Sequence, residues 1–169
     1  MVGLPIARVE LGGRRVIEKI GLADYIIHSC LNKYPNMIPY IFEPQSMVKM
    51  SRHFLRHCSG SYESCPVYAL RLKKFADWLG YSPDLIIQDV KPVGAIPDPM
   101  KVQNHCGFLS DYLAALQDSD LKPGAVSNYI KAVKTFYRTN GVKKIELDEP
   151  LSRNVSHKDR APKPEELSI

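Results

Sequence analysis

A line of basic side chains near residue 130 has the clearest chemical potential in this sequence. Lys131, Lys134 and Arg138 are three and four residues apart, so they lie along one face of a helix. Asn128 extends this line by one turn, and Ser127 precedes it. Basic groups neutralise phosphates, whereas Asn and Ser contact phosphates or base edges. The pattern predicts a DNA-contacting face, with a solvated helix face as the alternative.

Two other stretches carry basic residues at helical spacing. Arg71, Lys73 and Lys74 fall in a predicted helix over 64–79, and we expect DNA contacts from them too. Lys73 and Lys74 are about 100° apart around that helix, so they do not face DNA equally. A basic side of the predicted helix 46–58 is more simply interpreted as solvated; it contains Lys49, Arg52 and Arg56.

Apolar periodicity predicts the helices that position these side chains. Helices are expected over 46–58, 64–79, 100–117 and 123–139, with a short one from Ser82 or Pro83. In the helix 123–139 an apolar face lies opposite the basic line, and its members are Val126, Tyr129, Ile130, Val133, Phe136 and Tyr137. Gly80 and the Asn140-Gly141 pair are typical of helix ends. The predicted fold class is all-α.

The two ends of the chain differ from this helical middle. Residues 1–45 are predicted to be a separate extension, with a helix over 14–32 and a connector around Pro35, Pro39 and Pro44. Residues 46–144 form the predicted helical domain. Residues 145–169 are predicted to be a linker that leads toward a further domain.

The distribution of charge agrees with a polyanionic partner. The net charge is +5, and residues 46–144 alone contain 14 Lys and Arg against 8 Asp and Glu. Such an excess suits nucleic acid, although many domains with a similar charge bind none. The sequence has no run of apolar residues long enough to span a membrane and no signal-peptide pattern. We therefore expect a cytoplasmic protein without membrane association.

The histidines and cysteines give little support for a metal or redox site. His53 and His57 are four residues apart, a spacing that can share a metal. Cys58 points about 100° away from His57 on the same helix, and Cys65 follows a flexible step. No metal and no cofactor is predicted, and the four cysteines are expected to be reduced thiols. A small enzyme with a His/Cys site is the competing hypothesis.

The order of several motifs resembles a known family. The motifs are FxxWL at the end of one helix, YLxxL in the next, a Pro-initiated helix ending in FYRxxG, and a closing PxPEEL. Their residues here are Phe75, Trp78, Leu79, Tyr112, Leu113, Leu116, Pro123, Val126, Tyr129, Ile130, Ala132, Lys134, Phe136, Tyr137, Arg138, Gly141, Pro162, Pro164, Glu165, Glu166 and Leu167. Over residues 46–169 the chain is similar to the N-terminal core-binding domain of tyrosine site-specific recombinases, the Xer- and phage-integrase-like enzymes.

This resemblance implies a fold and a role. The fold is a SAM-like orthogonal bundle of four helices that clamps duplex DNA together with a separate catalytic domain. Sister protomers are the implied protein partners, because such enzymes act as tetramers on paired sites. The catalytic residues belong to the other half, so no catalytic residue is expected in this chain. Two departures are Lys122, where Ser or Thr is common, and a 45-residue front instead of a short arm.

A different class of function explains the same composition. In this alternative the chain is a stand-alone helical module that binds a protein through its apolar N-terminal helix and its tail. Its basic faces are then merely solvated, and it shows no salt-sensitive DNA binding.

Overall fold

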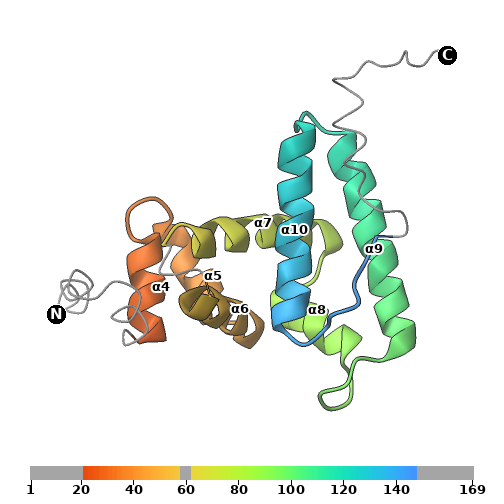
Figure 1. The fold of residues 1–169 in the computed structure, drawn as a ribbon, viewed down its shortest axis with the longest axis horizontal. Coiled ribbons are helices and arrows are strands. Elements are labelled where there is room, and N and C mark those ends of the chain that lie inside the picture. The colour runs from red at the N-terminus through yellow and green to blue at the C-terminus, as the bar shows by residue number, and fades with distance from the viewer. Residues whose placement is uncertain (1–20, 58–61, 148–169) are drawn as a thin grey trace.

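The protein is all-helical over the residues that its computed structural model describes, which are 21–57 and 62–147. These ranges contain seven α-helices, which are labelled in Figure 1, and one short 3₁₀ helix. They are α4 (Leu22–Cys30), η1 (Pro35–Met37), α5 (Ile38–Phe42), α6 (Gln45–His57), α7 (Ser64–Leu79), α8 (Pro83–Val90), α9 (Pro99–Gln117) and α10 (Pro123–Thr139). The predicted all-α class is confirmed. The assignment to a four-helix SAM-like bundle stays a prediction.

The helices after residue 45 begin and end close to where periodicity placed them. The bounds of α7 and α10 coincide with the predicted ones, and those of α6 and α9 differ by one residue. Gly80 ends α7 in the left-handed region with φ 84°, and its N–H donates to the carbonyl of Ala76. Ser82 starts α8 by accepting a hydrogen bond from the N–H of Leu85. Turn and cap chemistry thus fixes these boundaries locally.

The proline-rich segment before α6 is helical, which corrects the predicted connector. Pro35 and Pro39 occupy the first turns of η1 and α5, where a missing N–H costs no hydrogen bond. Pro44 accepts at its carbonyl from the N–H groups of Met47 and Val48, so it leads directly into α6. The prolines therefore start short helices here instead of ending them.

The predicted N-terminal extension shares one hydrophobic core with the later helices. Tyr25, Ile26 and Ile41 are fully buried in the same cluster as Met50 of α6 and Leu72 of α7. Of the helix predicted over 14–32, the described part begins at Leu22; residues 14–20 lie outside the described ranges. The domain boundaries at 45/46 and 144/145 stay predictions.

Helix α10 is positioned by packing and by a few buried polar contacts. It packs against α7, α6 and α9, and Figure 1 shows it crossing in front of α7 and running beside α9. At its end, the buried amide of Asn140 donates to the carbonyls of Ser46 (3.1 Å) and Phe136 (2.9 Å). Lys91 Nζ donates to the carbonyl of Asn140 at 2.8 Å. These bonds hold the end of α10 next to the start of α6.

A residue distant in sequence caps helix α6. The carboxylate of Asp84, in the first turn of α8, accepts from the N–H of Ser46 at 2.8 Å, from its hydroxyl at 2.7 Å and from the N–H of Gln45 at 3.2 Å. An anion at a helix N-terminus satisfies free N–H groups and complements the helix dipole. Asp84 thereby fixes α6 relative to α8 and, through Ser46, relative to α10.

Candidate nucleic-acid interface

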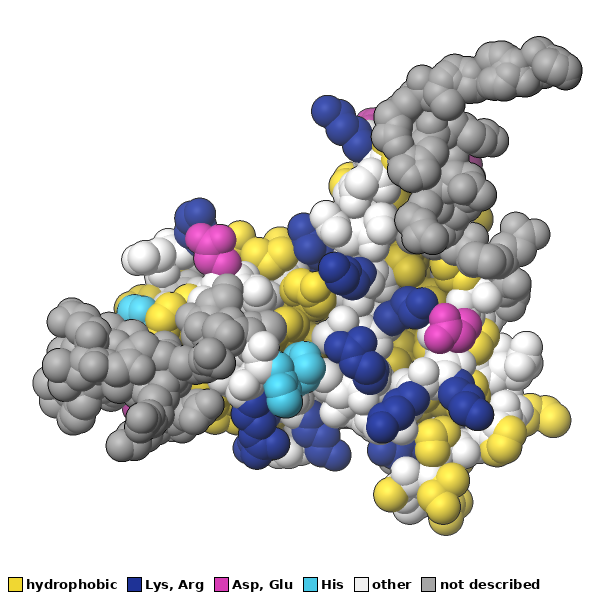
Figure 2. All heavy atoms as spheres, in the orientation of Figure 1, with side chains coloured by type: hydrophobic (Ala, Val, Ile, Leu, Met, Phe, Trp, Pro, Cys, Tyr) yellow, Lys and Arg dark blue, Asp and Glu magenta, His cyan; other side chains and the backbone are white. Residues whose placement is uncertain are grey.

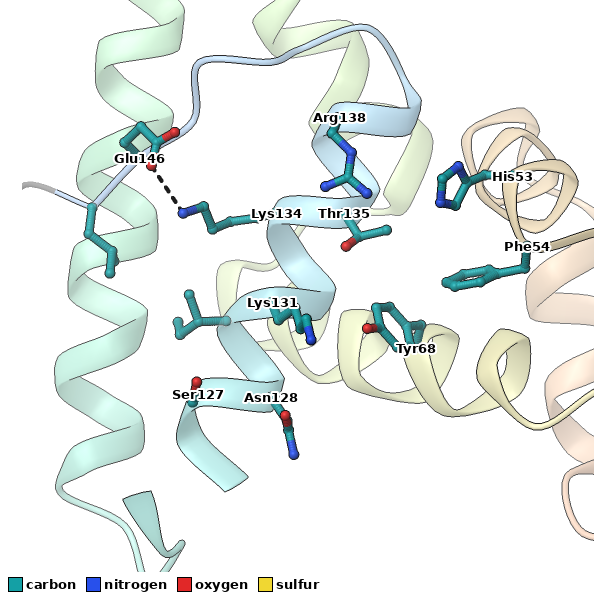
Figure 3. A pocket seen from close by; sticks show the side chains of 12 residues that line it. His53, Phe54, Tyr68, Ser127, Asn128, Lys131, Lys134, Thr135, Arg138 and Glu146 are labelled. Atoms are coloured by element: carbon teal, nitrogen blue, oxygen red, sulfur yellow. Dashed lines mark hydrogen bonds and ion pairs between the residues drawn. The ribbon is translucent and has the colours of Figure 1, made fainter. Parts of the chain in front are cut away.

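A groove of about 750 Å³ lies between α10 and α6 (Figure 3). Helix α7 supplies Tyr68 to its wall, and the extended segment after α10 supplies Glu146 and Leu147. The remaining lining residues come from α6 and α10, namely His53, Phe54, Ser127, Asn128, Ile130, Lys131, Lys134, Thr135 and Arg138. The groove thus unites side chains that are up to 94 positions apart in the sequence.

The basic line predicted on α10 faces this groove. Lys131, Lys134 and Arg138 all line it, together with Ser127 and Asn128. The opposite face of α10 is anchored in the core by Val133, Phe136 and Tyr137, which are fully buried. Burial of that face leaves the basic line on the open side of the helix. The structure therefore brings five of the eight predicted DNA-contact residues together.

Two of the three groove cations lack an acidic partner within the described ranges. Lys134 Nζ pairs with Glu146 at 3.0 Å; the Lys134 side chain is partly exposed, and that of Glu146 is well exposed. For Lys131 and Arg138 the described part of the chain shows no ion pair. In Figure 3 Lys134 turns toward Glu146, whereas Arg138 lies across from His53. The groove thus keeps a surplus of positive charge.

The wall of the groove toward α6 and α7 is apolar. Phe54 is 3 % exposed and meets the ring of Tyr68 edge-on, with the two ring centroids 4.9 Å apart. Thr135, at 6 % exposure, separates this aromatic pair from the basic line. Rigid apolar walls around cations lower the local polarity and strengthen attraction to an anion.

The basic residues predicted on α7 lie outside this groove. The guanidinium of Arg71 lies 5.7 Å from the centre of the Tyr129 ring, a cation–π distance. Lys73 Nζ pairs with Asp77 at 2.8 Å and lies 5.6 Å from the centre of the Tyr40 ring. Lys74 is exposed. DNA contact by Arg71, Lys73 and Lys74 stays a prediction, but the first two already have partners within the protein.

A second hollow, of about 280 Å³, adjoins the groove on α6. It is lined by Lys49, Arg52, His53, Arg56, His57 and Thr139. His53 lines both hollows. Figure 2 shows dark-blue Lys and Arg side chains gathered over α10 and the adjoining part of α6, with few acidic ones among them. Sequence reasoning interpreted the α6 cations as a solvated side.

A signal for the α6 cations was present in the sequence. Lys49, Arg52 and Arg56 repeat the three-and-four spacing of Lys131, Lys134 and Arg138. Only the contact between α6 and α10 makes the two lines neighbours. Two basic lines with the same spacing, on helices that pack together, thus indicate a shared basic surface.

Buried tyrosines belong to the scaffold. Tyr137 is fully buried, and its hydroxyl lies 2.7 Å from Nδ1 of His105, whose Nε2 lies 2.7 Å from Asp89. This chain links α8, α9 and α10 behind the groove. Tyr112 is 3 % exposed, and burial, with a contribution from Tyr129, raises its pKa to about 12. Both rings pack in the core, as their helical spacing predicted, and neither reaches the groove.

The described residues hold no group of three or more His, Cys, Asp or Glu side chains suited to a metal. Cys65 is buried, and its thiol donates to the hydroxyl of Ser51 at 3.3 Å. Cys58 lies outside the described residues. His53 and His57 lie among cations, a setting that favours an anion over a metal ion.

No protein-family model, no curated protein and no solved structure matches this chain. Among the helices in the described ranges, none has the length and apolar character needed to cross a membrane. The site must therefore be interpreted from its own geometry and charge.

Proposed function

We propose that this chain is a double-stranded DNA-binding domain that holds the phosphate backbone in the groove between α10 and α6. The observation that carries the proposal is the convergence of Lys131, Lys134 and Arg138 with His53 in one groove. Among the lining residues that the structure describes, Glu146 is the single acidic one. A surplus of cations without internal partners is what a polyanion neutralises.

Binding in this proposal is mainly electrostatic. Each ammonium or guanidinium that meets a phosphate releases condensed counterions, so affinity falls as salt rises. Ser127 and Asn128 lie in the first two turns of α10, at the end of the groove away from Arg138. Their hydroxyl and amide groups hold phosphates or contact base edges there.

The resemblance suggests the biological setting of this binding. We propose that the chain is the DNA-binding half of a tyrosine recombinase or integrase, which clamps duplex DNA for strand exchange by a separate catalytic domain. Support comes from the order of the sequence motifs, and from α7, α9 and α10, which lie where those motifs require helices. Sister protomers on paired sites are the protein partners under this proposal.

The stand-alone interaction module finds less support. That hypothesis needs an apolar N-terminal helix that is free for a partner. In α4 the residues Tyr25, Ile26 and Cys30 are fully buried against the rest of the chain. They offer no surface to another protein while the domain is folded.

Fluorescence anisotropy on a random-sequence duplex, titrated across salt, tests DNA binding directly. We expect a log–log slope equivalent to several released counterions. The double variant Lys131→Glu/Arg138→Glu removes the two groove cations that form no ion pair with a described residue, and it should weaken binding about threefold or more.

A matched control separates the groove from overall charge. Lys33→Glu/Lys122→Glu changes the net charge equally, at exposed positions that line neither hollow. It should retain most of the affinity. Absence of binding at low salt, or equal losses in the two double variants, would overturn the proposal.

A further inference from the structure

The hollow on α6 carries a concentration of positive charge that the groove alone does not account for. Three strong bases and two imidazoles line it, and none of its described lining residues is acidic. Within the described part of the chain, Lys49, Arg52 and Arg56 take part in no ion pair. Such crowding repels itself in the free protein, so an anion is the complement that the hollow lacks.

His53 lies at the junction between the hollow and the groove, and His57 lines the hollow next to it. Their ring centroids are 4.9 Å apart, and His53 also contacts the ring of Phe54. The charged groups around the pair are Lys49, Arg52 and Arg56 on α6, Arg138, Lys134 and Lys131 on α10, and Glu146 beyond α10. From α7, Tyr68 lines the groove together with His53. The pair therefore faces cations on both helices.

Burial and the surrounding positive charge disfavour protonation of His53 in the free protein. Burial, followed by the charges of His57 and Arg138, lowers the pKa of His53 below its ordinary value. Burial and the nearby Lys49 likewise lower the pKa of Lys91. A phosphate in the hollow reverses the sign of the local field, and an imidazole next to it becomes easier to protonate.

We propose that the α6 hollow is a second phosphate-binding site, continuous with the α10 groove, and that His53 takes up a proton when a backbone phosphate fills it. The inference rests on the proposed DNA binding and deepens it, because His53 connects the two hollows into one track for successive phosphodiesters of the same duplex. Protonation of His53 adds a hydrogen-bond donor and a positive charge at the junction, so the affinity for DNA rises as the pH falls.

The test compares DNA affinity across pH at constant ionic strength. The wild-type protein should bind a random-sequence duplex roughly tenfold more tightly at about pH 6 than at about pH 8, the range in which histidine titrates. His53→Gln/His57→Gln should flatten most of this dependence. The matched control is His28→Gln, because His28 lies on α4 against the ring of Tyr62 and lines neither hollow.

Two further measurements keep the inference falsifiable if the double histidine variant folds poorly. Arg52→Gln/Arg56→Gln changes two exposed side chains and should lower the salt slope by about one to two. Imidazole NMR of the wild-type protein should show the lowered pKa of His53 rising when duplex is added.

The outcomes separate this inference from the proposed function. Salt-sensitive binding that is independent of pH, with an unchanged slope in the arginine variant, overturns the second site and leaves the groove standing. Absence of DNA binding at any pH overturns both. If inorganic phosphate alone raises the pKa of His53 as much as the duplex does, the hollow takes free phosphate and the continuous track is wrong.

Discussion

Helices α7 and α10 carry similar basic residues with different surroundings. Each has three, namely Arg71, Lys73 and Lys74 on α7, and Lys131, Lys134 and Arg138 on α10. On α7 the guanidinium of Arg71 lies over Tyr129, and Lys73 is paired with Asp77. On α10 the three side chains share one groove, and only Lys134 has an acidic partner among the described residues.

The difference teaches that spacing alone does not make a binding face. A cation that already has a partner in its own protein must give it up to meet a phosphate, and the net gain is small. A cation held apart from acids by the packing of its helix offers its full charge. The comparison therefore predicts unequal contributions to DNA binding from two helices of similar charge.

Charge reversal of the three basic residues on each helix should give the largest difference in DNA binding between α10 and α7. Lys131→Glu/Lys134→Glu/Arg138→Glu should weaken duplex binding by on the order of 1 kcal/mol or more and reduce the salt slope by about three. Arg71→Glu/Lys73→Glu/Lys74→Glu changes the net charge equally and should reduce the slope by less than about one. Anisotropy across salt measures both. Equal slopes in the two variants would mean that α7 contacts DNA as extensively as α10.

The stacking of Arg71 on Tyr129 is testable through stability. A double-mutant cycle with Arg71→Gln and Tyr129→Leu should give a coupling energy of about 0.5–1 kcal/mol in urea unfolding, the range for an exposed cation–π contact. Tyr129→Phe preserves the ring and should preserve most of the coupling. A coupling energy near zero would return Arg71 to the set of cations available for DNA.

Removal of the acidic partners of Lys134 and Lys73 should have the smallest effect on DNA affinity, but it distinguishes the two helices directly. Glu146→Gln frees Lys134 inside the groove and should tighten DNA binding by about two- to threefold, the range for an exposed ion pair. Asp77→Asn frees Lys73 outside the groove, with the same change in net charge, and should leave the Kd nearly unchanged. Equal tightening in both variants would indicate an effect of net charge alone.

Local patterns were sufficient to predict most of the helices. In α10 a wide apolar stripe, Pro123 in the first turn and Gly141 just beyond the end specify both bounds without reference to the rest of the chain. In α7 the left-handed conformation at Gly80 does the same. The segment of Pro35 and Pro39 was misinterpreted because proline disfavours the interior of a helix but suits its first turn. Burial of Met37 and Ile41 in the core decides between the two.

Such local patterns predicted the α10 part of the candidate site but not the α6 part. The line from Asn128 to Arg138 follows from helical spacing, and the structure places it in one groove. The part contributed by α6 depends on long-range contacts, namely Asp84 on the start of α6 and Asn140 between α6 and α10. No periodicity within one helix encodes a partner 38 or 94 positions away.

By itself the sequence determined the all-helical class, the bounds of the main helices and the basic face of α10, because each depends on side chains within a few turns of one another. Tertiary structure alone decided which cations remain free. Arg71 meets Tyr129, and Lys134 meets Glu146, only because separate segments pack together. The same packing sets the basic line of α6 beside that of α10 at His53. The electrostatic potential at a surface depends on all the charges that are close in space, and the order of residues along the chain does not specify which charges those are.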